Sequence, residues 1–373
     1  MASNNPHPCL DLQTMPPAPK ARYRIGAIGS GFIMRDVQIV SYNDAGFETL
    51  AIASRTPANA REAAQLRGIP RVYDTWQELI ADTDVEVLDI AFPPDQQLEI
   101  VQAACEYSGH IKGILAQKPL AMNYPEARAV VRACDDAGIV LGVNQNMRYD
   151  QSIRALKTIL DRGYLGEPVL GTIEMRAIPH WQPFLEEYDR LTLLNMSIHH
   201  LDCFRFLFGD PASVYASCRP DPRTQFAHRD GICLYILEYE DGLRACSWDD
   251  VWAGPAREGA AGDCYIKWRV EGTEGLAQGT IGWPGYPNRQ PSTIEFSTTK
   301  QPGGWFRPQW REVWFPDAFS GTMGMLFDAI ATGTEPTISG RDNLNTMALV
   351  DACYRSIDEH RPVAISEVTG KDG

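Results

Sequence analysis

The sequence contains no apolar run that approaches the roughly 20 residues a membrane-spanning helix requires. It also lacks an excess of basic residues: 34 lysines and arginines stand against 48 aspartates and glutamates, for a formal net charge of −14. A surface of this sign is unsuited to nucleic acid and to anionic membranes. We therefore expect neither partner, although the balance leaves room for a local basic pocket that binds phosphate.

Paired cysteine motifs are missing as well. The nine cysteines are scattered without a Cys-x-x-Cys pair, and their spacing indicates no zinc or other metal site. Free thiols in a reducing compartment are the simplest interpretation, so we expect a cytoplasmic protein. Residues 1–21 are rich in proline and lack an apolar centre. We expect a flexible arm there, and not a signal peptide.

From residue 22 to residue 148 the chain alternates short apolar runs with amphipathic segments of about ten residues. Continuous apolar strands separated by helices predict a doubly wound parallel sheet. The predicted strands are Tyr23–Ile28, Thr49–Ser54, Val85–Phe92, Ile111–Ala116 and Ile139–Val143. Ligands of such sheets bind at the carboxyl ends of the strands.

The first strand is followed by a glycine turn, Gly29-Ser30-Gly31, and then by Phe32 and Ile33 at the start of a predicted helix. A strand, a glycine turn and a helix start form the geometry that holds a dinucleotide pyrophosphate. Met34 stands where the third glycine of the pattern belongs. An ordinary strand-to-helix turn can carry the same two glycines, so the prediction of a dinucleotide site depends on the alternation of strands and helices around the motif.

The second strand ends in Ser54 and Arg55, where an NAD-specific site usually has an acidic residue for the ribose 2′-hydroxyl. Serine and arginine suit a 2′-phosphate, which favours NADP over NAD. The alternative is that Arg55 stacks on the adenine and that either cofactor binds.

Lys118 follows the fourth strand and precedes a proline. A lysine at this carboxyl end lies where a reacting hydroxyl would bind, and it can transfer protons if burial lowers its pKa. An ordinary surface lysine is the competing interpretation.

The predicted helix over Thr192–Phe208 places Asn195, His199 and Asp202 on one face, at spacings of four and three residues. His199 can donate or accept a proton near neutral pH. Asn195 can orient a substrate, and Asp202 could hold the imidazole in one tautomer. A structural histidine with a local hydrogen bond is the alternative.

A second domain is predicted over residues 149–373. Its residues 168–315 read mostly as strands joined by tight turns, which predicts an antiparallel sheet, and helices are predicted at 151–160, 318–332 and 343–359. Eight of the nine tryptophans lie beyond residue 180. Aromatic rings suit the apolar faces of sugars, and Trp181, Trp248 and Trp252 are the candidates; core packing is the alternative.

Taken together, four motifs resemble the Gfo/Idh/MocA oxidoreductases over about residues 23–363. They are the glycine turn, Gln117-Lys118-Pro119, the strand end NQNMR (144–148) and the helix NMSIHHLDCFRFLFGDP (195–211). The family's Glu-Lys-Pro motif matches residues 117–119, so its catalytic lysine falls on Lys118. Its Asp-x-x-x-His pair falls on Asn195 and His199, and only the histidine is kept. Gln97 stands where many members have a histidine.

The resemblance implies a Rossmann domain, an open-faced sheet domain and reversible hydride transfer between NAD or NADP and a sugar, inositol or glycoside carbon. It extends the candidate cofactor contacts to Pro93, Pro94, Gln97, Gln117, Lys118, Asn146 and Arg148. The candidate substrate contacts are Lys118, Arg148, His180, Trp181, Asn195 and His199. A homodimer or homotetramer is expected, because open sheets bury a face by pairing.

Two alternatives stay open. One is an enzyme of the same fold that acts on a non-carbohydrate substrate such as a dihydrodiol. The other is a nicotinamide-binding regulator without catalysis, suggested by Gln117 and Asn195 in place of ionisable residues.

Overall fold

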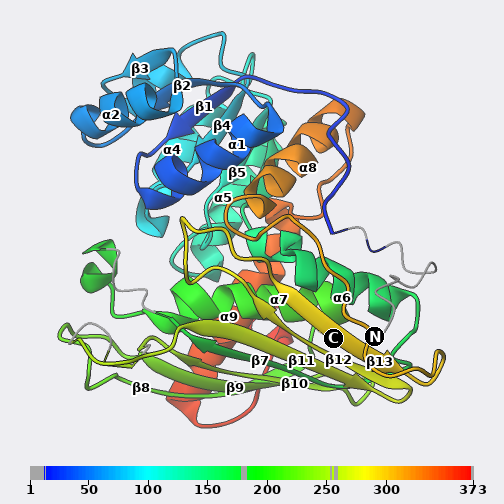
Figure 1. Ribbon diagram of the computed structural model, residues 1–373. Coiled ribbons are helices and arrows are strands. Elements are labelled where there is room, and N and C mark those ends of the chain that lie inside the picture. Colours follow the sequence, from blue (N-terminus) through cyan, green and yellow to red (C-terminus); the bar gives the residue numbers. More distant parts are fainter. Residues whose placement is uncertain (1–11, 13, 178–182, 253, 256–258, 371–373) are drawn as a thin grey trace. The chain divides into compact units, whose positions relative to one another are not determined.

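The computed structural model describes residues 12, 14–177, 183–252, 254, 255 and 259–370 (Figure 1). These residues form two units. The parallel-sheet unit comprises Pro16–Asn146 and Phe315–Met347. The mixed-sheet unit comprises the described parts of Met1–Met15, Met147–Trp314 and Ala348–Gly373. Within this described part of the chain, no helix combines the length and the apolar character needed to cross a membrane.

The parallel-sheet unit is built on six parallel strands in the order β3-β2-β1-β4-β5-β6, which confirms the predicted doubly wound sheet. The central strands are buried on both faces, as a parallel sheet covered by helices requires. The elements are β1 (Ile25–Ile28), η1 (Ile33–Gln38), α1 (Ile39–Ala45), β2 (Thr49–Ala53), α2 (Pro57–Arg67), β3 (Arg71–Tyr73), α3 (Trp76–Ile80), β4 (Val87–Ile90), α4 (Pro94–Cys105), β5 (Gly113–Ala116), α5 (Tyr124–Ala137), β6 (Val140–Val143) and α8 (Ala318–Thr332).

The register of this sheet aligns the carboxyl ends of four strands. Ala53, Ile28, Ile90 and Ala116 are successive partners across β2, β1, β4 and β5. The segments that follow these residues therefore meet along one edge of the sheet, which we call the carboxyl edge. The predicted cofactor residues between positions 29 and 118 come from those segments and from the helix starts beside them.

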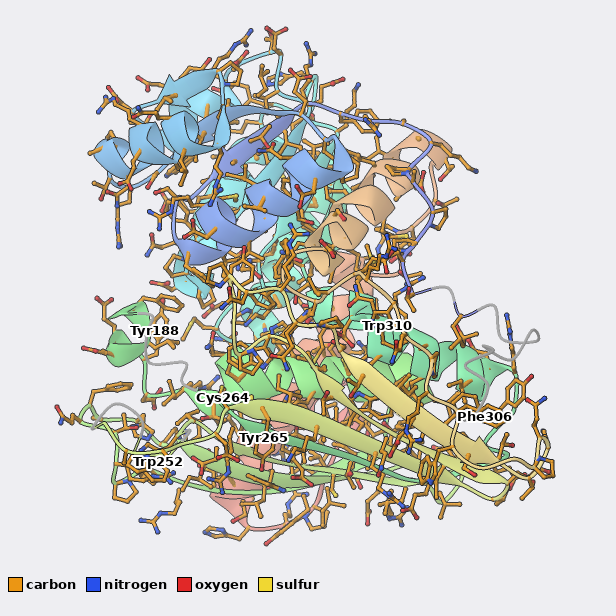
Figure 2. All side chains as sticks on the ribbon, viewed as in Figure 1. Tyr188, Trp252, Cys264, Tyr265, Phe306 and Trp310 are labelled. Carbon is orange, nitrogen blue, oxygen red and sulfur yellow. The ribbon has the colours of Figure 1, made fainter. Side chains whose placement is uncertain are left out.

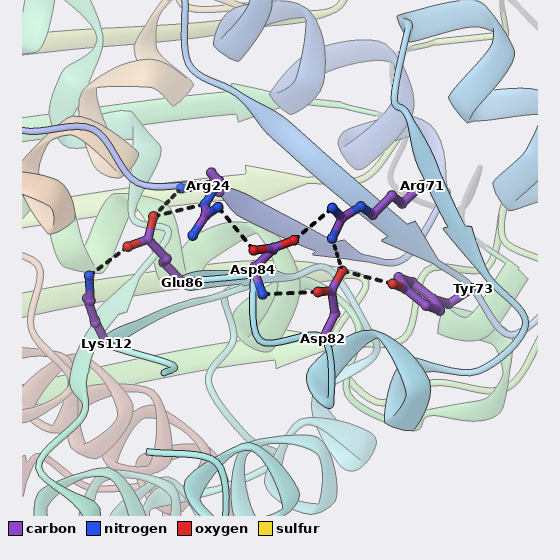
Figure 3. A network of polar contacts seen from close by, with 7 residues as sticks. All are labelled: Arg24, Arg71, Tyr73, Asp82, Asp84, Glu86 and Lys112. Atoms are coloured by element: carbon purple, nitrogen blue, oxygen red, sulfur yellow. Dashed lines mark hydrogen bonds and ion pairs between the residues drawn. The ribbon is translucent and has the colours of Figure 1, made fainter. Parts of the chain in front are cut away.

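The opposite, amino edge of the sheet carries a network of charged side chains (Figure 3). Its ion pairs join Arg71 to Asp82 and Asp84, Arg24 to Asp84 and Glu86, and Lys112 to Glu86. Tyr73 donates a hydrogen bond to Asp82. These residues flank the amino ends of β1, β4 and β5 and the short strand β3, and most of them are solvent-accessible.

One predicted domain boundary differs from the division in the structure. Residues 149–373 were expected to form one domain, but Phe315–Met347 belongs to the parallel-sheet unit. Helix α8 packs on β5 and β6, where glycines leave room for it: a Cβ added at Gly113 would lie 2.6 Å from Ile330 Cδ1. The backbone N–H of Ser320 also donates to Ser41 Oγ on α1.

The mixed-sheet unit has eight strands in the order β13-β12-β11-β7-β10-β9-β8-β14. All neighbours pair antiparallel except β7 and β10, so the predicted, mainly antiparallel sheet is confirmed. Figure 1 shows α6 and α7 along one face of it. The elements are η2 (Asn146–Tyr149), α6 (Gln151–Asp161), β7 (Pro168–Arg176), η4 (Pro183–Glu187), η5 (Leu193–Ser197), α7 (Ile198–Phe208), β8 (Ser213–Arg219), β9 (Ile232–Glu238), β10 (Arg244–Asp250), β11 (Tyr265–Gly272), β12 (Gly275–Ile281), β13 (Thr293–Thr298), α9 (Gly340–Glu359), β14 (Val363–Ala364) and α10 (Ser366–Thr369).

Strand β12 was not predicted, because three glycines in and beside it hide the strand pattern. The structure explains one of them. A Cβ at Gly279 would lie 2.4 Å from the indole of Trp268, its direct partner on β11. Trp268 is buried beneath α6, where its Nε1 donates to Ser152 Oγ at 3.0 Å.

Candidate active site

The glycine turn after β1 has the geometry that a pyrophosphate site needs. Gly29 has φ of +119°, and a Cβ there would lie 2.6 Å from the carbonyl oxygen of Ala91. Only glycine fits both constraints. At Gly31 an added Cβ would meet no described atom within 4 Å. Gly31 is therefore not required by packing, and its missing side chain leaves the backbone accessible to a ligand, as a dinucleotide cradle requires.

The helix after this turn begins with a π-helical segment, η1, and continues as α1. Met34 is fully buried in a core cluster with Ala27 and Ile52. The residue in place of the third glycine is thus an ordinary core side chain. Of the remaining candidates, Phe32 is the cap residue of η1 and is exposed, and Ile33 begins η1. Pro93 is the cap residue of α4, and Pro94 begins that helix.

At the end of β2, Ser54 Oγ accepts a hydrogen bond of 2.7 Å from Ser30 Oγ. This bond joins the glycine turn to the segment predicted to meet the adenosine ribose. Arg55 is exposed, and the hydrogen bonds and ion pairs among the described residues do not involve it. Its guanidinium is therefore available to a ligand.

Lys118 lies at the carboxyl end of β5 in a segment held by two glutamines. Gln97 is completely buried, and its amide nitrogen donates to the carbonyl oxygens of Gln117 (2.9 Å) and Pro119 (2.7 Å). Its Oε1 accepts from the N–H of Gln117 at 2.9 Å. The side chain of Gln117 accepts from the N–H of Lys118 at 3.1 Å. The structure thus gives Gln97 a backbone-holding function, and its predicted cofactor contact stays a prediction.

The electrostatic state of Lys118 fits proton transfer. The residue as a whole is half-buried. Burial of its ammonium group lowers the pKa of Lys118 to about 7, because an apolar environment disfavours the charged form. A lysine with this pKa exchanges its proton near neutral pH, as a general acid or base must.

In the mixed-sheet unit, the predicted histidine helix begins with a π-helical turn. Asn195 lies in that turn, η5, and His199 lies in the first turn of α7. Both are nearly buried. The imidazole of His199 meets the indole of Trp314 edge-on, with ring centroids 6.1 Å apart. His180 and Trp181 lie outside the described residues.

Arg148 and Asp202 form a buried bidentate ion pair. Arg148 Nε donates to Asp202 Oδ2 at 2.5 Å, and Nη2 donates to Oδ1 at 2.7 Å. Both carboxylate oxygens of Asp202 thus accept hydrogen bonds from an arginine, and the hypothesis that Asp202 holds the imidazole of His199 in one tautomer stays a prediction. The pair ties η2 to α7. Asn146, at the start of η2, is also buried and donates to the carbonyl oxygen of Asn144.

One residue that positions the histidine helix was missed from the sequence. Asp230, just before β9, accepts hydrogen bonds from the N–H groups of Leu191 (2.6 Å) and Leu193 (2.8 Å) at the start of η5. The hydroxyl of Tyr354 donates to the same carboxylate at 2.7 Å. Burial raises the pKa of Asp230. No sequence signal could have indicated it, because the donors lie almost 40 residues away.

The neighbouring His200 has a structural function. It is fully buried, and its Nδ1 lies 2.9 Å from Asp249 Oδ1 on β10. Because strand side chains alternate between faces, Trp248 points to the other face of the sheet, where its indole meets Tyr265 edge-on. This position favours the packing interpretation of Trp248 over the sugar-stacking one.

A groove of about 750 Å³ lies in the mixed-sheet unit between the strands and residues 307–310. Trp310, labelled in Figure 2, lines it together with side chains from β7, β11, β12 and β13. Among the predicted site residues that the structure describes, none lines this groove. It is therefore a feature separate from the candidate active site.

Comparison with known proteins defines the class of the chain. Residues 23–145 match the family described as "Oxidoreductase family, NAD-binding Rossmann fold", and residues 153–278 match the GFO/IDH/MocA C-terminal domain. The class is thus a nicotinamide-dependent oxidoreductase. The chain belongs to the Gfo/Idh/MocA family, which confirms the resemblance inferred from the motifs.

The chain is similar to D-apiose dehydrogenase of Rhizobium rhizogenes, with 30% identity over 347 residues, 91% of this chain and 96% of that protein. It is 26% identical over 354 residues to inositol 2-dehydrogenase of Rhizobium meliloti, covering 92% and 99% of the two chains. An oxidoreductase of Agrobacterium radiobacter, solved with NAD+, L-tartaric acid and magnesium, is 27% identical, with a TM-score of 0.77 over 93% of this chain and 99% of that one.

Proposed function

We propose that the chain catalyses reversible hydride transfer between a nicotinamide cofactor and a secondary hydroxyl of a sugar, an inositol or a glycoside, with Lys118 as the acid/base group. The observation that carries this proposal is Lys118 itself, a lysine with a pKa of about 7 that is held at the carboxyl edge by two glutamines. The names of the relatives, which are dehydrogenases of apiose and inositol, support the substrate class.

In the direction of oxidation, the neutral amine of Lys118 takes the proton of the substrate hydroxyl. The carbon of that hydroxyl loses a hydride, and the C–O single bond becomes a carbonyl. A bound nicotinamide supplies the hydride acceptor, and the glycine turn and the adjoining carboxyl edge would hold it. In the direction of reduction, the Lys118 ammonium returns the proton to the carbonyl oxygen. His199 is a second candidate for proton transfer, and Asn195 and Arg148 are candidates for orienting the substrate.

We further propose a preference for NADP over NAD. The exposed Arg55 and the hydroxyls of Ser30 and Ser54 follow β1 and β2, and an acidic residue is absent from the end of β2. Arginine and serine provide donors for a 2′-phosphate. The ratio of the dissociation constant for NADP to that for NAD tests this: it should lie below one in the parent, and Arg55→Ala should raise it toward one. An unchanged ratio would leave Arg55 as an adenine-stacking residue only.

The first experiment uses the purified protein. After denaturation, mass spectrometry identifies any released nicotinamide, and the native protein is assayed for reduced-cofactor absorbance with a panel of sugars, inositols and glycosides. Turnover of one panel member would support the proposal and narrow the substrate. Cofactor binding without turnover of any carbohydrate would favour the alternatives, namely a dihydrodiol-type substrate or a regulator.

A Lys118→Met variant separates those two alternatives. An enzyme on any hydroxyl substrate loses turnover in this variant and keeps the cofactor. A regulator's response to its ligand would be unaffected. Failure of the parent protein to bind either nicotinamide would contradict the proposed function as a whole.

We also propose that the chain forms a homodimer or a homotetramer through the face of the mixed sheet opposite α7. Three apolar side chains on this face are unusually exposed: Leu234 (52%), Ile236 (46%) and Tyr215 (42%). They are neighbours, because Ile236 pairs with Tyr215, and Leu234 pairs with Trp248. A contiguous apolar patch of this kind supports a protein interface.

Sedimentation velocity of the parent and of Leu234→Asp tests the interface. The charge on the patch should shift the protein toward monomer. Leu66→Asp is the matched control, because Leu66 is an equally exposed leucine (57%) on α2 of the parallel-sheet unit. A parent that is monomeric at micromolar concentration would contradict the proposal.

The cytoplasmic location stays a prediction, which the free thiols of the eight described cysteines support.

A further inference from the structure

Strand β4 carries a buried carboxylic acid that the proposed chemistry does not use. Asp89 is 1% exposed and lies between Ala27 of β1 and Leu115 of β5 in the middle of the parallel sheet. A carboxylate in such a place is costly unless it is hydrogen-bonded. Asp89 Oδ2 accepts two short bonds, from Gln38 Nε2 and from the Tyr42 hydroxyl, both at 2.6 Å.

One of these two bonds continues toward Lys118. The side-chain oxygen of Gln38 accepts from Gln117 Nε2 at 3.3 Å. The side-chain oxygen of Gln117 accepts in turn from the N–H of Lys118 at 3.1 Å. A continuous line of hydrogen bonds therefore runs from the carboxylate of Asp89 through two amides to the backbone of the proposed acid/base lysine.

The chemistry of the three groups gives this line a direction. An ionised carboxylate only accepts hydrogen bonds, so it requires the NH2 end of the Gln38 amide. The oxygen end of Gln38 then faces Gln117, and it can only accept the NH2 end of that amide. The oxygen of Gln117 is left to accept from Lys118 N–H. If Gln38 were reversed, Gln117 would present its NH2 group to another donor, and this bond would be lost.

We propose that Asp89 is a positioning residue for the reaction, which fixes the Lys118 segment through the amide orientations of Gln38 and Gln117. This inference rests on the proposed function of Lys118. Position 117 is a glutamine here, where the resemblance to the family implies a glutamate. The carboxylate is instead that of Asp89, which is two hydrogen bonds away from Gln117 along the line. The positioning charge lies in the interior of the sheet.

The ionisation of Asp89 bears on this function. Burial raises the pKa of Asp89 to about 7, although the hydrogen bonds from Tyr42 and Gln38 favour the carboxylate. The titratable group that contacts it is Tyr42, whose own pKa burial raises well above its usual range, so Tyr42 stays neutral. A protonated Asp89 can donate, and the direction of the amide line is then no longer imposed.

Gln38→Met and Tyr42→Phe form a matched pair of variants. Both residues are fully buried, and each variant removes one hydrogen bond from the same oxygen of Asp89. Only Gln38→Met cuts the line to Lys118. It should lower kcat by roughly 10- to 100-fold, the effect of a misplaced catalytic group, with KM changed little. Tyr42→Phe leaves the line intact but removes a bond that favours the carboxylate, so kcat is compared at pH 9, above the Asp89 pKa of about 7, where Asp89 is ionised. There Tyr42→Phe should lower kcat by much less than Gln38→Met does. Asp89→Leu should follow Gln38→Met.

A second readout is independent of turnover. Competitive labelling of Lys118 with acetic anhydride, followed over pH by peptide mass spectrometry, gives the pKa of its amine. Gln38→Met should shift this pKa more than Tyr42→Phe does, because only Gln38→Met cuts the line to Lys118. Equal kcat and equal Lys118 labelling in the two folded variants would overturn the proposal, even if Asp89→Leu fails to fold. If Lys118→Met keeps full turnover while the two variants still differ in labelling, the proposed function of Lys118 fails and Asp89 has no positioning function in the reaction, although the amide line still holds the Lys118 segment.

Discussion

The two edges of the parallel sheet use polar side chains in opposite ways. At the amino edge, six of the seven residues of Figure 3 carry full charges and the seventh, Tyr73, donates a hydrogen bond to one of them; most of the seven are accessible to water. At the carboxyl edge, the line from Asp89 to Lys118 contains one carboxylate and two amides, and it is largely buried.

The difference shows where orientation matters. Exposed ion pairs tolerate several geometries and contribute little each, because water and salt compete with them. A buried amide can form all its hydrogen bonds in only one orientation, and that orientation determines which end of the next amide must face it. The ion pairs of the amino edge therefore each add a little to the stability of the fold, whereas the hydrogen bonds at the carboxyl edge fix the position of a single amine, that of Lys118.

The largest effect is expected from Lys118 itself. Lys118→Met removes the amine and keeps an unbranched side chain of similar length. We expect kcat to fall by about 10²- to 10⁴-fold, the usual contribution of general acid–base catalysis. Cofactor affinity, measured by fluorescence titration, should stay within a few-fold of the parent. If the Lys118→Met variant kept the parental kcat, Lys118 would not be the acid/base group, and the carboxyl edge would have no catalytic function that distinguishes it from the amino edge.

The glycine turn gives the next largest effect, and it separates folding from binding. Gly31→Ala adds a Cβ that meets no described atom. The melting temperature should therefore change little, while cofactor affinity should fall tenfold or more, about 1.4 kcal/mol.

Gly29→Ala is the contrasting variant, because its Cβ would approach the carbonyl oxygen of Ala91 to 2.6 Å at a φ of +119°. The cost in folding free energy should be about 1–3 kcal/mol. Differential scanning fluorimetry and cofactor titration of both variants give the comparison. Parental cofactor affinity in Gly31→Ala would show that the backbone of this turn does not approach the ligand.

The pH dependence of turnover tests the state of Lys118. Oxidation requires the neutral amine, which exists above the pKa of about 7. The rate of oxidation should therefore rise with pH, be about tenfold lower at pH 6 than on the plateau, and level off above pH 8. Reduction requires the ammonium, so its rate should fall as the pH rises through the same range. A profile that is flat from pH 6 to pH 9 in both directions would contradict a lowered lysine pKa.

The extent to which the sequence predicted these features follows from the range of the interactions involved. Local signals revealed the glycine turn, Lys118 and most strands, because alternation and turn residues act over a few positions. Strand β12 was not predicted because glycines such as Gly279 interrupt its strand pattern. Gly279 is needed there because the ring of Trp268, eleven residues earlier in the sequence, leaves no room for a side chain. The return of α8 to the parallel-sheet unit depends on glycines in β5 and β6, some 200 residues earlier.

The positioning residues were missed for related reasons. Asp89 carried a signal, an acidic residue inside the apolar run VEVLDIAF, but its partners, Gln38 on η1 and Tyr42 on α1, are visible only in the fold. Gln97 was identified, and its position suggested a cofactor contact. The hydrogen bonds that the structure describes for it instead hold the backbone around Lys118. Residue type indicates what a group can do, and three-dimensional contacts decide which partner it serves.

The smallest effect on stability and turnover should come from a substitution at the amino edge. A small effect there would support the contrast between the two edges. Lys112→Met removes the ion pair with Glu86, whose N–O distance is 2.6 Å, and leaves Arg24 to pair with the same carboxylate. Unfolding free energy should change by less than about 1 kcal/mol, and the difference should shrink further in 0.5 M salt, because the pair is exposed. Cofactor affinity and kcat should not change. A loss of turnover as large as that of Gln38→Met would mean that the exposed network also positions Lys118 through the sheet, and the contrast between the two edges would not hold.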